Sequence, residues 1–266
     1  MKIYEFGKKE NPVIFLFPGT CCHWKANFGE VIPLLEESFY VVCVSYDGFD
    51  ETEDTVFHDM LMETKKVEKY IQKKFGGHIC AAYGCSLGGS FVGLLVQRKK
   101  IHIDHGILGS SDLDQSGPFS AQLKAAIVTP MLAGLLRKDS IPRFMKKWIA
   151  KQPEEEQDYY RKMMEMFGIG SGRMAFVRKK SIRNQFYSDL VTPLKNAISV
   201  PETTIHCFYA VKMGVEYEKR YRRHFKSPDI RRHDLQHEEL LMRYPKEWVR
   251  EIVSCCGMLH FYHRDT

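Results

Sequence analysis

The chain has 266 residues, of which 44% are hydrophobic and 27% are charged, and its formal net charge is +6. This composition is typical of an ordinary soluble globular protein. Lysines and arginines are spread along the chain rather than massed in one arm, which argues against a nucleic-acid-binding protein. The densest basic run, residues 219–232, is typical of a solvated helix face.

The N-terminal residues 1–5 contain no long apolar segment, and no later stretch approaches the length of a transmembrane helix. We therefore expect a cytoplasmic protein with no membrane partner.

The eight cysteines predict reduced thiols rather than disulfides. Cys43, Cys80 and Cys207 fall inside predicted buried strands, while residues 21–22 and 255–256 are adjacent pairs that can scarcely bridge to each other. No Cys-x-x-Cys or Cys/His ligand spacing occurs, so the sequence predicts no zinc, no other metal and no cofactor.

The first part of the chain alternates apolar runs typical of buried strands with amphipathic stretches typical of helices. Strands are expected at residues 1–6, 13–17, 39–45, 78–83 and 103–108, and helices at about 24–37, 54–75 and 91–97. This alternation predicts a mainly parallel sheet with right-handed crossovers.

From about residue 113 to residue 197, helical patterns follow one another without a convincing strand. The alternation then resumes with a strand at 203–210, a helix at 215–225, a short strand near 229–233 and a final helix at 245–256. The expected fold class is therefore α/β, with a mainly parallel central sheet flanked by helices. Residues 1–114 and 198–266 form the expected core, and residues 115–197 form a helical cap inserted over the sheet.

The stretch 81–90 holds the pattern Gly84-x-Ser86-x-Gly88 between an expected strand and an expected helix. A serine at such a sharp turn is forced into a strained backbone conformation, and the glycines leave room for the chains to pass closely. The turn would hold the Ser86 hydroxyl clear of the sheet, at a helix N-terminus whose dipole favours negative charge. The pattern predicts a nucleophile.

Several motifs together resemble the α/β-hydrolase family, over most of the chain outside the insertion. Residues 84–89 match the family's nucleophile elbow, and 17–20 (Phe-Pro-Gly-Thr) look like its His-Gly oxyanion turn with Pro18 in place of histidine. Residues 46–48 resemble the family's segment at the end of the strand that follows the oxyanion turn. Residues 189–210 resemble the family's return from the cap to the core, and residues 236–241 resemble its catalytic-histidine loop. The resemblance implies an α/β-hydrolase fold and a serine hydrolase of the esterase kind.

A serine hydroxyl needs a base that takes its proton and later protonates the leaving group, a role that suits histidine. Of the eleven histidines, His237 follows the last expected strand and precedes the last helix, which would put it at the same edge of the sheet as Ser86. His233 lies inside the expected strand and is interpreted as structural. His23 lies near the oxyanion turn, where a pocket and a surface role both stay open.

By resemblance, the oxyanion hole is formed by the backbone N–H of Leu87 and by that of Thr20 or Cys21. The acid of the triad is less clear, because the slot in which the family carries Asp or Glu is Met213. Asp112, which follows the preceding strand, is the first choice, and Glu216 and Asp234 are the alternatives. A dyad without an acid also stays open.

The sequence thus predicts a serine hydrolase that cleaves a small carboxylic ester through a Ser86–His237–Asp112 triad and an acyl-enzyme. Amide, thioester, lactone and carbon–carbon bonds are cleaved by the same parts and stay open. The alternative is a non-catalytic member of the fold that binds a small ligand, favoured by Met213 and Pro18. The expected partner is a small-molecule acyl substrate, and the sequence predicts no oligomeric state.

Overall fold

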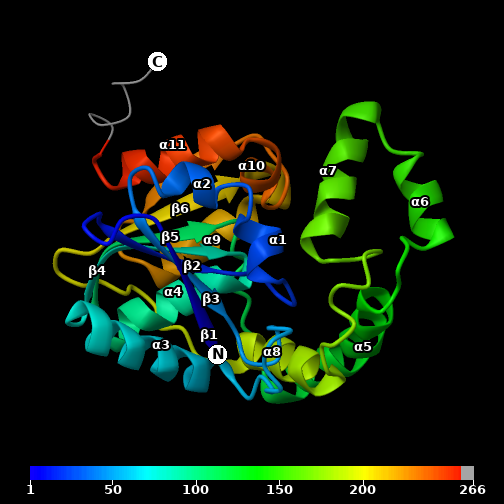
Figure 1. The fold of residues 1–266 in the computed structure, drawn as a ribbon, viewed down its shortest axis with the longest axis horizontal. Coiled ribbons are helices and arrows are strands. Elements are labelled where there is room, and N and C mark those ends of the chain that lie inside the picture. The colour runs from blue at the N-terminus through cyan, green and yellow to red at the C-terminus, as the bar shows by residue number, and fades with distance from the viewer. Residues whose placement is uncertain (259–266) are drawn as a thin grey trace.

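The computed structural model describes residues 1–258, and its centre is a seven-stranded sheet (Figure 1). Across the sheet the order is β1-β3-β2-β4-β5-β6-β7. Only β1 runs antiparallel to its neighbour, and the other paired strands are parallel, which confirms the predicted mainly parallel sheet. The strands are β1 (Lys2–Phe6), β2 (Val13–Phe17), β3 (Tyr40–Ser45), β4 (His78–Cys85), β5 (His102–Gly109), β6 (Thr204–Ala210) and β7 (Asp229–His233).

Helices bury both faces of this sheet, which is why its central strands are apolar without alternation. Along β2, Phe15 and Phe17 pack into one core and Ile14 and Leu16 into the other, since successive side chains point to opposite faces. The first core is closed by α3 (Met60–Phe75), α4 (Leu87–Arg98) and α9 (Val215–His224). The second is closed by α1 (Trp24–Phe28), α2 (Ile32–Leu35), α10 (Glu239–Arg243) and α11 (Pro245–Cys255).

Two predicted helices differ from those in the structure. The helix expected over 24–37 is split into α1 and α2, because Gly29 is a poor helix former and Pro33 fits only the first turn of a new helix. The helix expected from residue 54 begins at Met60, where Asp59 is the N-cap and its side chain accepts a hydrogen bond from the Met62 N–H at 2.8 Å.

The segment between β5 and β6 contains the helices α5 (Pro118–Leu136), α6 (Arg143–Ile149), α7 (Glu154–Met166) and α8 (Lys179–Val191). Small residues on the buried face of α5, among them Ala121 and Ala125, let it pack closely on α8. Helix α7 contacts α10, where the Lys162 amine donates to the Met242 carbonyl at 3.0 Å. In Figure 1, α6 and α7 stand beside the body that contains the sheet. The division into a core and a cap at residues 115–197 stays a prediction.

Helix α5 corrects one expectation drawn from the sequence. With 19 residues and a mean hydropathy of 1.4, it is long and apolar enough to cross a membrane by length and composition, whereas no such stretch was expected. Its most apolar window is 28% buried in the structure, where it packs on α8.

Candidate active site

Ser86 lies at a sharp turn between the end of β4 and the start of α4. Its backbone has φ 49° and ψ −111°, a conformation that costs free energy for any residue with a side chain. The turn closes tightly: a Cβ on Gly84 would lie 2.0 Å from the Gly88 carbonyl carbon, and one on Gly88 would lie 2.2 Å from the Phe17 carbonyl oxygen. Glycine is therefore required at both positions, as the sequence pattern predicted.

Two neighbouring segments, the end of β5 and the loop before α10, hold the turn. The Ser86 N–H lies 2.8 Å from the Gly109 carbonyl oxygen and 2.8 Å from Glu238 Oε1. The Ser86 carbonyl accepts a hydrogen bond from Ser111 Oγ at 2.6 Å. Since strained backbone persists only where its surroundings over-determine it, these bonds explain how the turn is maintained.

Glu238 carries a buried carboxyl that accepts a hydrogen bond from the Ser86 backbone. Only 3% of the residue is exposed, and its Oε2 accepts a hydrogen bond from the Tyr83 hydroxyl at 3.0 Å. Its own N–H donates to Ser110 Oγ at 3.1 Å. Burial raises the pKa of Glu238 from 4.5 to about 7, although the bonds from Ser86, Tyr83 and Cys85 act in the opposite direction. This residue therefore titrates near neutral pH while it touches the backbone of Ser86.

His237 lies in the loop between β7 and α10, next to Glu238 in the chain. Burial lowers the pKa of its imidazole, and the negative charge of Asp112 partly opposes this effect. The imidazole is therefore mainly neutral at pH 7, the form that can accept a proton. Helix α7 reaches the same loop, because its Tyr159 hydroxyl donates to the His237 carbonyl at 3.1 Å.

The three candidate acids lie in different surroundings. Asp112 follows β5, and its charge acts on His237. Glu216 is an exposed residue in the first turn of α9 and pairs with Lys219 at 2.6 Å, which lowers its pKa. Asp234 is an exposed residue just after β7. Asp112 is thus the one of the three whose charge acts on the candidate base.

Within residues 1–258, no hydrogen bond joins the Ser86 hydroxyl, the His237 imidazole and the Asp112 carboxylate. Ser86 follows β4, Asp112 follows β5 and His237 follows β7, so all three lie beyond the carboxyl ends of parallel strands, and the charge of Asp112 acts on His237. Catalytic hydrogen bonds are often long or poorly aligned without substrate.

The candidate oxyanion donors lie on two loops. Leu87 is the first residue of α4, so its N–H belongs to the first turn of a helix, where no carbonyl four residues back can accept it. The Cys21 N–H, in contrast, donates to Gln185 Oε1 of α8 at 2.7 Å. Since this bond occupies the Cys21 donor, the structure favours Thr20 over Cys21 as the partner of Leu87.

The cysteines near the turn are packed rather than reactive. Cys21, Cys22 and Cys85 are all buried. Burial raises the pKa of all three thiols, that of Cys22 to about 12, so these side chains stay protonated near neutral pH.

Sequence reasoning missed three residues that hold this site. Glu238 and Gln185 contact Ser86 and Cys21 across more than 150 positions of the chain, and Ser111 fixes the Ser86 carbonyl from the next strand. The one signal available was that an acidic residue, Glu238, directly follows His237. The sequence does not show whether such a glutamate is buried or lies at the surface.

A scan of family models and a search of curated protein sequences found no match to the chain. Solved structures do resemble it. A protein from Desulfitobacterium hafniense, described as belonging to the α/β hydrolase family, has a TM-score of 0.73 and 14% identity over 95% of this chain and 99% of its own. The enol-lactonase from Burkholderia xenovorans LB400 has a TM-score of 0.66 and 14% identity over 96% of each chain. The carboxylesterase CesB from Bacillus subtilis has a TM-score of 0.65 and 14% identity over 96% of this chain and 87% of its own.

These likenesses cover nearly the whole chain at low identity, so they establish the architecture. The chain has the α/β-hydrolase fold.

The buried carboxyl of Glu238 predicts a pH-dependent stability. The pKa of Glu238 is about 7 in the folded chain, whereas the ordinary value of 4.5 applies to the unfolded chain. The folded state therefore binds this proton more tightly than the unfolded state does. Stability from this proton is complete below pH 4.5 and is lost as the pH rises through 7. The free energy of unfolding should fall by about 2 kcal/mol more in the wild type than in Glu238→Gln between pH 5.5 and 8.

Urea unfolding at both pH values measures this difference, and Glu216→Gln, an exposed glutamate, is the matched control that should keep the wild-type dependence. Equal pH dependence in Glu238→Gln and the wild type would contradict the assignment.

Proposed function

We propose that this chain is a hydrolase that cleaves a carboxylic ester of modest size through an acyl-enzyme on Ser86. The observation that carries the proposal is the strained Ser86 turn at the start of α4, the backbone geometry expected of a nucleophile elbow. The presence of His237 and Asp112 at the same edge of the sheet supports it. The names of two structural neighbours, a lactonase and a carboxylesterase, point to the same kind of acyl bond.

In the proposed reaction, Ser86 Oγ attacks the carbonyl carbon of the ester while His237 accepts the hydroxyl proton. The N–H groups of Leu87 and Thr20 stabilise the negative oxygen of the tetrahedral intermediate. His237 then protonates the leaving alcohol, and the acyl group stays on Ser86. Water, deprotonated by His237, attacks the acyl carbon and releases the acid and the free serine.

Asp112 acts on His237 in this scheme. Its negative charge stabilises the imidazolium that forms when His237 takes the serine proton. The same charge counteracts the effect of burial, which would otherwise make His237 too weak a base.

We further propose that the cap determines which acyl group is accepted. Helix α5 exposes an apolar stripe at intervals of four residues, formed by Phe119, Leu123, Ile127 and Met131. Helix α6 adds the exposed Phe144 and Trp148. Apolar surface of this kind suits the hydrocarbon part of an acyl substrate. The cytoplasmic location expected from the sequence, and the absence of nucleic-acid and membrane partners, stay predictions.

Replacement of the nucleophile tests the proposal. Ser86→Ala should lower kcat on nitrophenyl esters by at least about 1,000-fold, because no hydroxyl remains to form the acyl-enzyme. Ser254→Ala, on α11, should retain the wild-type rate. A wild-type chain that hydrolyses no ester from acetate to decanoate would favour the ligand-binding alternative, and equal rates in Ser86→Ala and wild type would exclude Ser86 as nucleophile.

A second prediction concerns the acid. Asp112→Asn should lower kcat/KM by about 100-fold or more, whereas Glu216→Gln should leave it close to the wild-type value. Because the charge of Asp112 raises the pKa of His237, its removal should also shift the acid limb of the pH profile to lower pH. Stopped assays across pH 4–9 measure both effects. A larger loss in Glu216→Gln, or an acid limb that moves upward in Asp112→Asn, would contradict the assignment.

A further inference from the structure

A cluster of two histidines and one aspartate lies at the N-terminal ends of β4 and β5, opposite the end that carries Ser86. His78 and His102 are the first residues of β4 and β5, and the parallel register pairs them directly. Asp104 lies two residues further along β5, so it projects from the same face as His102. By strand geometry, the seven-residue separation from His78 to Cys85 spans roughly 23 Å, so the cluster is remote from the Ser86 turn.

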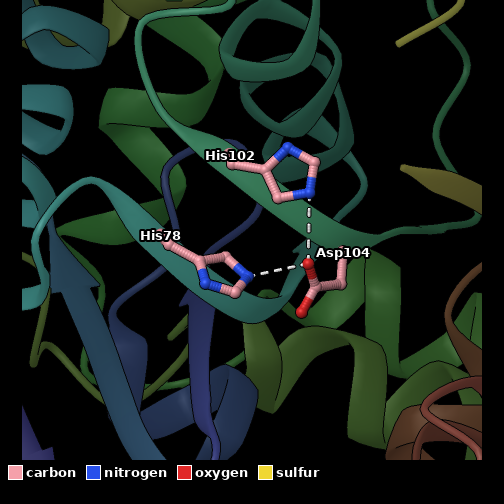
Figure 2. A group of neighbouring side chains, drawn as sticks. All are labelled: His78, His102 and Asp104. Atoms are coloured by element: carbon pink, nitrogen blue, oxygen red, sulfur yellow. Dashed lines mark hydrogen bonds and ion pairs between the residues drawn. The ribbon is translucent and has the colours of Figure 1, made fainter. Parts of the chain in front are cut away.

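The three side chains converge on one point. His78 Nε2 lies 2.7 Å from Asp104 Oδ1, and His102 Nε2 lies 3.2 Å from the same oxygen. Figure 2 shows both rings directed at the carboxylate, one from each strand. The ligating atoms of all three residues lie within 4.8 Å of one another.

We propose that His78, His102 and Asp104 bind a divalent first-row transition-metal ion such as Zn²⁺. The geometry carries the proposal, because the Nε2 atoms of two imidazoles on neighbouring strands face the same carboxylate oxygen. This donor set suits a metal ion, which binds neutral imidazoles and an ionised carboxylate.

The donor set identifies the class of ion. Two imidazole nitrogens and one carboxylate oxygen suit Zn²⁺, Co²⁺ or Ni²⁺, whereas Ca²⁺ and Mg²⁺ prefer oxygen ligands alone. Tetrahedral zinc with bonds of about 2.0–2.2 Å needs ligand atoms about 3.3–3.5 Å apart. The 2.7 Å distance would therefore lengthen by about 0.6–0.8 Å and the 3.2 Å distance by about 0.1–0.3 Å.

The exposure of these side chains permits this adjustment. The His78 side chain is 59% exposed and that of Asp104 is 33% exposed, so both can rotate without repacking a core. The backbone that carries them is already held by the hydrogen bonds between β4 and β5. Metal binding would therefore cost little backbone conformational entropy. Water can complete the coordination from the exposed side.

Another group with suitable atoms is the weaker candidate. His23, Asp50 and Glu51 also bring their ligating atoms within 4.8 Å of one another. The Asp50 carboxylate is buried and already accepts hydrogen bonds from the Tyr4 hydroxyl at 2.8 Å and the Thr52 N–H at 3.0 Å. The carboxylate of Asp104, in contrast, is bonded to the two other ligands themselves.

The proposed ion would join the ends of β4 and β5 far from the elbow, so its effect should be on stability. An ion that binds the folded chain alone raises the midpoint of thermal unfolding. The inference does not depend on the proposed hydrolase activity.

Isothermal titration of the tag-free, reduced protein with ZnCl₂ tests the proposal. We expect one saturable site per chain, binding that weakens at least tenfold in both His102→Gln and Asp104→Asn, and a Zn²⁺-dependent rise in the unfolding midpoint that both variants lose. His58→Gln, an exposed histidine outside the cluster, is the matched control and should bind as the wild type does. The unfolding midpoint of each variant without metal verifies that it is folded.

Cys80→Ser tests the nearest rival ligand, because Cys80 lies on β4 two residues after His78 and therefore projects from the same face. This variant should bind Zn²⁺ as tightly as the wild type. No saturable binding by the wild type, unchanged binding in the His102 and Asp104 variants, or loss of binding in Cys80→Ser would each overturn the assignment.

Discussion

The backbone of Ser86 is the constraint on which the candidate active site depends. A positive φ at a residue with a side chain is unfavourable, and here it is held by hydrogen bonds to the end of β5 and to the loop before α10. Glu238 supplies the bond that crosses from the histidine loop to the elbow. Because His237 and Glu238 are adjacent, a single loop carries the candidate base and the carboxyl that supports the backbone of Ser86.

Helices α7 and α8 are tied into the same constraint. Gln185 of α8 accepts a hydrogen bond from the Cys21 N–H, and Tyr159 of α7 donates one to the His237 carbonyl, so helices of the segment between β5 and β6 hold both loops. A change in these helices would therefore reach the candidate oxyanion loop and the candidate base through two hydrogen bonds. Substrate preference and catalytic geometry are therefore coupled in the proposed enzyme, since α5 and α6, which would contact the acyl group, pack on α8 and α7, which hold the loops.

Local sequence patterns predicted the strands and the turn at Ser86, because a buried strand requires a run of apolar residues and a tight turn requires glycines at nearby positions. The run from Val13 to Phe17 and the glycines at 84 and 88 are such patterns. Long-range partners leave none, which is why Glu238 and Gln185 were missed. The His78–His102–Asp104 cluster has the same origin: its ligands are 24 and 26 positions apart and meet only through the register of β4 and β5, so that a search for short ligand spacings could not find them.

The central claim is that the strained turn presents Ser86 as a nucleophile. Its most direct test is peptide mapping by mass spectrometry after the wild-type chain reacts with a fluorophosphonate at neutral pH. We predict one covalent adduct, on the Ser86 side chain, because the reagent requires a serine activated by a base. No adduct, or an adduct confined to another serine, would contradict the account.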